Sequence, residues 1–151
     1  MMMRTFFRRR MVSALAIVGA MLVSGCLKST DPQPSLLQLN GTWTYTGIQT
    51  GPVRETLGGT LTISRESGTS FQGRLDLVAV NSQTGESRVL GGLVSGSESA
   101  SDVIDFDADV ESSPRRHVGQ IVADTISGTW VGSASDGTMS SGTFRVERES
   151  Q

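Results

Sequence analysis

The sequence is poor in cysteine and histidine, two side chains suited to nucleophilic, general-base and metal-binding chemistry. The 151 residues include one cysteine, Cys26, and one histidine, His117. A thiol can be acylated, oxidised or bound to a metal, and histidine is the side chain that ordinarily titrates near neutral pH. A single cysteine excludes an internal disulfide, and a single histidine excludes a histidine-rich metal site.

Cys26 stands at the end of an apolar run. Residues 1–10 contain four arginines and no acid, and residues 12–23 carry no charge. A basic start, about 7–15 apolar residues and small residues before a cleavage site are typical of a secretory signal peptide. The run is shorter than the roughly 20 residues that span a bilayer core.

The residues Val23-Ser24-Gly25-Cys26 resemble the lipobox of bacterial lipoproteins. The resemblance implies that Cys26 is acylated, becomes the mature N-terminus and anchors the chain to the membrane of the cell envelope. Leu27 in place of aspartate implies transfer to the outer membrane if the organism has one. The alternative is a buried structural cysteine within an ordinary signal peptide or an uncleaved anchor.

The segment after the cysteine predicts a tether. Residues 28–35 are polar, include two prolines and contain no apolar side chain, so they favour an extended, semi-rigid spacer of at most about 25 Å. We therefore expect a lipoprotein signal peptide at 1–25, a lipidated N-terminus and tether at 26–36, and one folded domain at 37–151.

The net charge of the mature chain limits the kinds of molecule that it is expected to bind. Cleavage after residue 25 removes four of the 13 basic residues and none of the 15 acidic ones, so the mature chain has a net charge of −6. No basic cluster remains, which argues against nucleic acid or anionic headgroups as partners. The 126 remaining residues fit a single domain, which we expect to be a monomer.

Apolar and polar residues alternate through the predicted domain. Phe144 and Val146, for example, alternate with Arg145 and Glu147, as in strands with one wet face. Turn sequences separate eight such segments, near 42–49, 59–66, 70–80, 87–96, 102–110, 116–123, 126–135 and 138–148. Short connections favour an all-β, eight-stranded antiparallel up-and-down barrel over a Greek key.

Gly41-Thr42-Trp43, at the head of the first predicted strand, resembles the G-x-W motif of lipocalins and related calycin barrels. In that group an arginine near the end of the last strand packs over the tryptophan. Arg148 shares the parity of the apolar residues of its strand, so we predict that it points inward onto Trp43 as a structural pair, while Arg145 faces water. Small barrel-shaped inhibitors of the bacterial envelope share this layout.

The spacing of Asp105, Asp107 and Asp109 suggests a calcium loop, but an EF-hand would need glycine and glutamate where Val110 and Arg116 stand. Their alternation with apolar residues instead predicts the solvent face of a strand.

We expect His117 at a strand start on the surface. Serines are frequent, yet none lies in a G-x-S-x-G motif. The sequence therefore predicts no catalytic residue, no cofactor and no metal site.

These observations favour a non-enzymatic envelope lipoprotein whose barrel is a binding or interaction module. The alternatives are a lipocalin-like carrier of a small apolar ligand and a small envelope inhibitor. The predicted domain has only six aromatic side chains, which could fill the interior of an eight-stranded barrel, so we expect a packed barrel. The expected partners are the membrane, through Cys26, and an envelope protein or a small apolar ligand.

Replacing Cys26 with serine tests the anchor. The wild-type protein, produced in a bacterium, should incorporate a palmitate analogue and sediment with membranes. The Cys26→Ser variant should lose the label because acylation requires the thiol, and Ser29→Ala, outside the lipobox, should keep it. Label retained by Cys26→Ser would contradict acylation at this residue.

Overall fold

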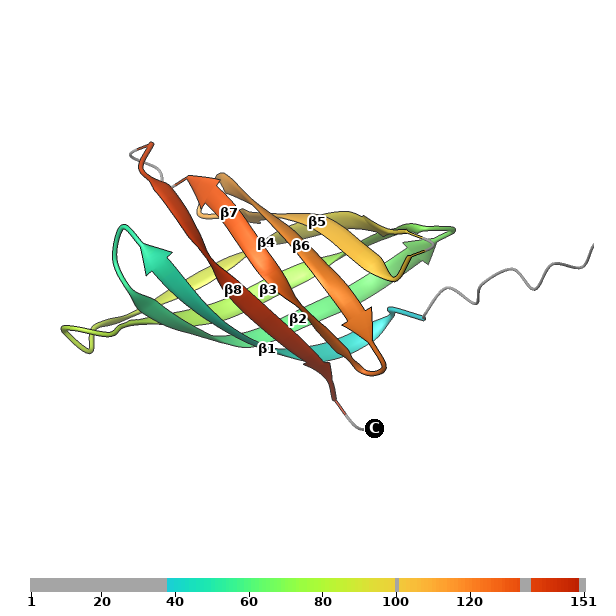
Figure 1. Cartoon of the computed structure of the whole chain (residues 1–151), viewed down its shortest axis with the longest axis horizontal. Coiled ribbons are helices and arrows are strands. Elements are labelled where there is room, and N and C mark those ends of the chain that lie inside the picture. Colours follow the sequence, from blue (N-terminus) through green and yellow to red (C-terminus); the bar gives the residue numbers. More distant parts are fainter. Residues whose placement is uncertain (1–37, 100, 134–136, 150–151) are drawn as a thin grey trace, which may run out of the picture. The chain divides into compact units, whose positions relative to one another are not determined.

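The computed structural model describes residues 38–99, 101–133 and 137–149. They form a closed antiparallel barrel in which each strand pairs with the next (Figure 1). The strands are β1 (Gly41–Gly51), β2 (Glu55–Ser67), β3 (Ser70–Asn81), β4 (Ser87–Glu98), β5 (Val103–Val110), β6 (Ser113–Val122), β7 (Thr125–Ser133) and β8 (Met139–Arg148). The predicted all-β, eight-stranded up-and-down barrel is confirmed.

Two strands begin three or four residues earlier than the sequence predicts. β2 begins at Glu55, because the Gly58-Gly59 pair continues the ladder opposite β3 and does not make a turn. β6 begins at Ser113, because Pro114 is accommodated next to the turn, where it is exposed and lies opposite Asp109. Both differences arise where turn-forming residues lie inside a paired strand.

The barrel closes where β8 pairs antiparallel with β1, with Arg148 opposite Trp43. Closure removes the open edges through which sheets aggregate. Alternate side chains therefore point into one interior, whose large buried side chains include Trp43, Tyr45, Phe106 and Trp130. None of the described residues forms a helix long and apolar enough to cross a membrane.

An inward-facing glycine makes room for one of these rings. A Cβ atom at Gly142 would lie 2.7 Å from the indole Nε1 of Trp130 and 2.1 Å from the carbonyl oxygen of Ile48. The indole of Trp130 thus lies over the backbone of β8 at Gly142. A side chain at position 142 would occupy the space of the indole.

The end of the barrel at which β1 begins, here termed the Trp43 end, is closed by the chain that enters it. Trp43 is fully buried and its Nε1 donates to the Leu39 carbonyl at 2.9 Å. The guanidinium carbon of Arg148 lies 4.3 Å from the centroid of the Trp43 ring. Arg148 also donates to the carbonyls of Asn40, at 3.1 Å, and Gln38.

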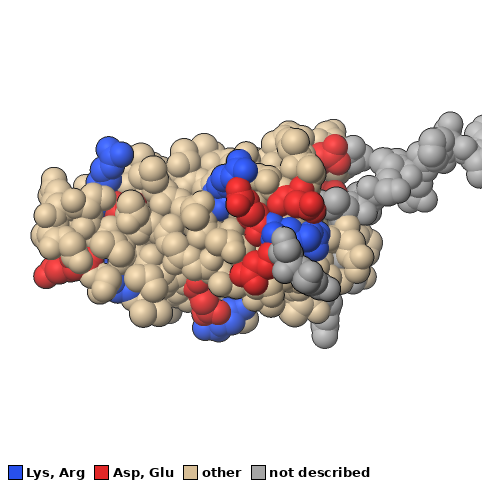
Figure 2. Space-filling model, turned by 90° about the horizontal axis from the view of Figure 1, so that it is seen from below, with Lys and Arg blue, Asp and Glu red and all other residues tan. Residues whose placement is uncertain are grey.

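The outer surface carries charges of both signs. Figure 2 shows arginine side chains intermixed with Asp and Glu on the face that it presents. Arg74 pairs with Asp76 at 2.9 Å and Arg145 with Glu147 at 2.7 Å. That face therefore has no extended patch of a single sign.

The Trp43 end predicts unequal losses of stability. Trp43→Ala should lower the free energy of unfolding by about 3–5 kcal/mol, because it empties the space of a large buried ring. Arg148→Ala should cost about 1–2 kcal/mol, from the cation–π contact and the carbonyl hydrogen bonds. Urea unfolding measures both, with the exposed Arg145→Ala as the matched control. Equal losses at Trp43 and Arg148 would contradict this account.

Candidate functional site

β6 turns polar side chains into the barrel. Arg115 and His117 are only 5% and 1% exposed, whereas Val118 and Val122 on the outer face are 41% and 67% exposed. The predicted surface position of His117 is therefore wrong. Because β6 begins at Ser113, His117 lies in mid-strand, between Phe106 of β5 and Trp130 of β7.

His117 is fully engaged by its neighbours. Its ring stacks on Phe106 with centroids 4.5 Å apart, and its Nδ1 lies 2.9 Å from the Arg115 carbonyl oxygen. Because a carbonyl only accepts, Nδ1 carries the proton, and Nε2 accepts from the Tyr45 hydroxyl at 3.3 Å. Burial lowers the pKa of His117 to about 4, so the imidazole is neutral at neutral pH.

Arg115 is a buried cation with little direct compensation. Its guanidinium carbon lies 4.9 Å from the centroid of the Trp130 ring, and its Nη2 lies 3.9 Å from the nearer carboxylate oxygen of Glu111. Burial lowers the pKa of Arg115, and the positive charge of Arg88 acts in the same direction. A buried charge of this kind is costly unless close hydrogen bonds compensate it.

Three buried polar atoms in the described part of the chain have no hydrogen-bond partner: Gln49 Oε1, Arg115 Nε and Trp130 Nε1. Gln49 lies opposite Gly142, and Gly142 lies opposite Trp130, whose indole covers it. The three side chains, here termed the Trp130 cluster, thus come from β1, β6 and β7. An unsatisfied buried donor or acceptor costs about 1–3 kcal/mol, so the fold retains hydrogen-bonding capacity that it does not use.

Charged residues border the cluster at the end of the barrel opposite the Trp43 end, here termed the mouth and formed by Glu55, Arg88 and Glu111. Arg88 binds both carboxylate oxygens of Glu55, at 3.1 and 2.8 Å, and donates to Glu111 at 2.7 Å. Arg88 therefore binds both carboxylates, and neither lies within hydrogen-bond distance of Arg115. The two ends of the barrel differ in chemistry: Arg148 and backbone carbonyls cap a buried tryptophan at one end, and Arg88 joins two carboxylates at the other.

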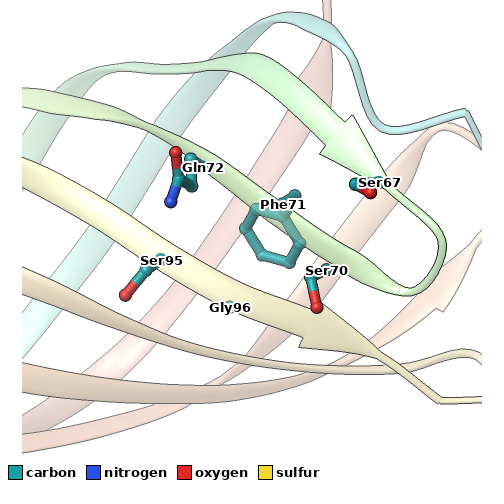
Figure 3. A pocket seen from close by; sticks show the side chains of 6 residues that line it. All are labelled: Ser67, Ser70, Phe71, Gln72, Ser95 and Gly96. Carbon is teal, nitrogen blue, oxygen red and sulfur yellow. The ribbon is translucent and has the colours of Figure 1, made fainter.

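Two shallow hollows lie on the outside of the barrel. One, of about 270 Å³, is lined by Ser67, Ser70, Phe71, Gln72, Ser95 and Gly96 (Figure 3). The other, of about 420 Å³, shares Gln72 and Ser95 and extends to Leu93, Asp107 and Asp109. Their polar lining comes from exposed side chains of neighbouring strands, without a buried ionisable group among them.

The structure places the other residues singled out by sequence as follows. Trp43 and Arg148 lie together at the Trp43 end, and Cys26 lies outside the described residues. Asp107 and Asp109 face outward, as the alternation predicted, and Arg116 lowers the pKa of Asp105 by hydrogen bonding to its carboxylate. No group of three metal-ligating side chains gathers within the ranges that the structure describes.

Sequence reasoning missed the Trp130 cluster. One signal was present in Arg115-Arg116, because consecutive residues of a strand face opposite sides and one arginine had to point inward. The neighbours that leave Trp130 Nε1 unsatisfied come from other strands and are visible only in the fold.

Comparison with known proteins finds likeness of fold only. No family model matches the chain, and no curated protein matches it. Among solved structures, EF1p2_mFAP2b bound to DFHBI is 14% identical, covers 74% of this chain and 94% of its own, with a TM-score of 0.60. A de novo designed fluorescence-activating β-barrel is 18% identical over 73% of this chain and 93% of its own, with a TM-score of 0.53.

A protein of unknown function from Bacteroides ovatus is 10% identical over 74% of this chain and 42% of its own, with a TM-score of 0.51. At these identities the likeness concerns the fold alone. The chain therefore shares its barrel fold with these structures.

Replacing Arg115 with methionine tests whether this buried arginine stabilises the fold. Arg115→Met removes a poorly compensated buried charge and preserves much of the volume, so the free energy of unfolding should stay unchanged or rise by about 1–3 kcal/mol. Glu111, half exposed, keeps Arg88 as its partner. Urea unfolding measures the effect, and the outward Arg116→Met is the control, expected to change little. A loss of about 3–5 kcal/mol would instead show that Arg115 is a structural member of an ion-pair network.

Proposed function

We propose that this protein is a lipid-anchored, non-enzymatic binding module of the bacterial cell envelope, whose barrel takes up a small molecule at the Trp130 cluster. The observation that carries the proposal is the set of three unsatisfied polar atoms on three strands inside one barrel. Buried polar groups are normally hydrogen-bonded, so a set left without partners is a candidate for a ligand.

The fold supports this choice. An eight-stranded barrel has room for its own side chains or for one small ligand. EF1p2_mFAP2b and mFAP1, two barrels of similar fold, have structures bound to DFHBI. The likeness to these two barrels is one of fold, and the polar side chains inside the barrel are specific to this chain.

The anchor follows from the lipobox resemblance. An acylated Cys26 and a tether over 26–36 lead to the Trp43 end, where Arg148 donates to the carbonyls of Gln38 and Asn40. The tether therefore joins the barrel at the end where β1 begins. A small molecule then reaches the cluster from the envelope compartment.

A binding role fits the interior better than catalysis. His117 is the side chain best suited to general-base chemistry near neutral pH, but both of its ring nitrogens are engaged inside the barrel. Its pKa of about 4 is also far below the value that proton transfer at neutral pH favours.

Native mass spectrometry tests the proposal on protein extracted from the envelope of the bacterium that produces it. We expect a mass above that of the lipidated chain, released as a small molecule on collisional activation. Trp130→Phe, which keeps a ring but removes the N–H donor, should carry less of it, whereas Arg116→Met should carry the wild-type amount. The mass of the lipidated chain alone, or a bound protein in place of a small molecule, would contradict the proposal.

A further inference from the structure

The unsatisfied atoms of the Trp130 cluster have a definite hydrogen-bonding character. Trp130 Nε1 and Arg115 Nε are donors, and Gln49 Oε1 is an acceptor. The amide of Gln49 is oriented by its Nε2, which donates to the Val53 carbonyl at 3.0 Å, so its oxygen is the free atom. A ligand must therefore offer oxygen to two N–H groups and a hydrogen to one amide oxygen.

The charge of Arg115 selects among possible acceptors. A guanidinium binds carboxylates in preference to neutral oxygens, because charge-assisted hydrogen bonds are about twice as strong as neutral ones. Arg115 is 5% exposed, so water screens its charge poorly. The low-dielectric surroundings strengthen any interaction that an anion makes there.

Among the described residues, no carboxylate lies within hydrogen-bond distance of Arg115. Glu111 approaches Arg115 only to 3.9 Å, beyond hydrogen-bond distance, because Arg88 holds the Glu111 carboxylate at 2.7 Å. The second carboxylate at the mouth, Glu55, is bound through both oxygens to Arg88. Glu111 is therefore the nearest internal competitor for Arg115, and a weak one.

Aromatic rings limit the size of the ligand. Tyr45 stacks with Phe144, centroids 6.0 Å apart, and Phe106 stacks with His117 deeper in the same interior. These rings fill the barrel between the cluster and the Trp43 end. A ligand at the cluster would therefore approach from the side of the mouth.

We propose that the Trp130 cluster binds a small carboxylate whose oxygens accept from Arg115 Nε and Trp130 Nε1. Gln49 Oε1 accepts from a hydroxyl or N–H of the same molecule or of a water bound with it. This inference rests on the proposed function and names the class of ligand. Glu111 competes weakly for Arg115, so its carboxylate lowers the affinity for such a ligand.

NMR of the two indole N–H groups tests the inference on the detergent-extracted, ¹⁵N-labelled protein. The chain has two tryptophans, and the N–H of Trp43 is occupied by the Leu39 carbonyl, so Trp43 is an internal reference. Hexanoate should shift the Trp130 signal saturably and leave the Trp43 signal in place. Hexanamide has the same chain length but no charge. Its affinity should be lower by about tenfold or more.

Three variants complete the test. Arg115→Met should weaken hexanoate binding about tenfold or more, and Arg116→Met, its outward neighbour, should leave binding unchanged. Glu111→Gln should tighten binding roughly twofold to fivefold by removing the competing carboxylate. Unfolding curves recorded on each variant establish that the protein is folded.

The outcomes separate this inference from the proposed function. Equal affinity for hexanoate and hexanamide would overturn the carboxylate preference and leave small-molecule binding in place. No shift of the Trp130 signal with hexanoate would overturn the carboxylate inference. The proposed function fails in addition only if native mass spectrometry finds no bound small molecule.

Discussion

The antiparallel pairing of β8 with β1 is the constraint on which the rest of the structure depends. Once Arg148 lies opposite Trp43, every strand has two neighbours and every second side chain faces one enclosed interior. A polar residue of the inward parity cannot turn to water without breaking two ladders of backbone hydrogen bonds. The closure thus forces each inward polar group either to find a partner inside or to remain unsatisfied.

β6 contains one inward polar side chain that finds partners inside the barrel and one that does not. His117 finds partners in Tyr45 and in the Arg115 carbonyl, and its neutral ring packs as one more aromatic side chain. Arg115, two residues earlier, keeps a charge with no close acceptor. The two ends of the barrel differ accordingly. Ring burial and hydrogen bonds to backbone carbonyls cap one end, while unused donors lie beside three charged side chains at the other.

Sequence predicted the strands well because alternation and turn residues are local signals. It also paired Trp43 with Arg148, since closure of a meander places the first and last strands side by side. The same reasoning failed for β6, because apolar residues occur on both of its faces. Val118 and Val122 lie on one face, and Ile121 lies on the other with His117. Only the pairing with β5 and β7 decides which face points inward. The state of Trp130 Nε1 depends on Gly142 and Gln49 of other strands, and no local pattern encodes that.

The titration of His117 tests most directly whether closure places the polar face of β6 inside. His117 is the sole histidine, so one imidazole signal reports on it without assignment. We expect a pKa of about 4 for His117, because burial penalises the charged ring and the positive charge of Arg115 acts in the same direction. A pKa near the ordinary value of about 6.5, with the protein folded throughout, would place His117 in water and contradict the inward register of β6.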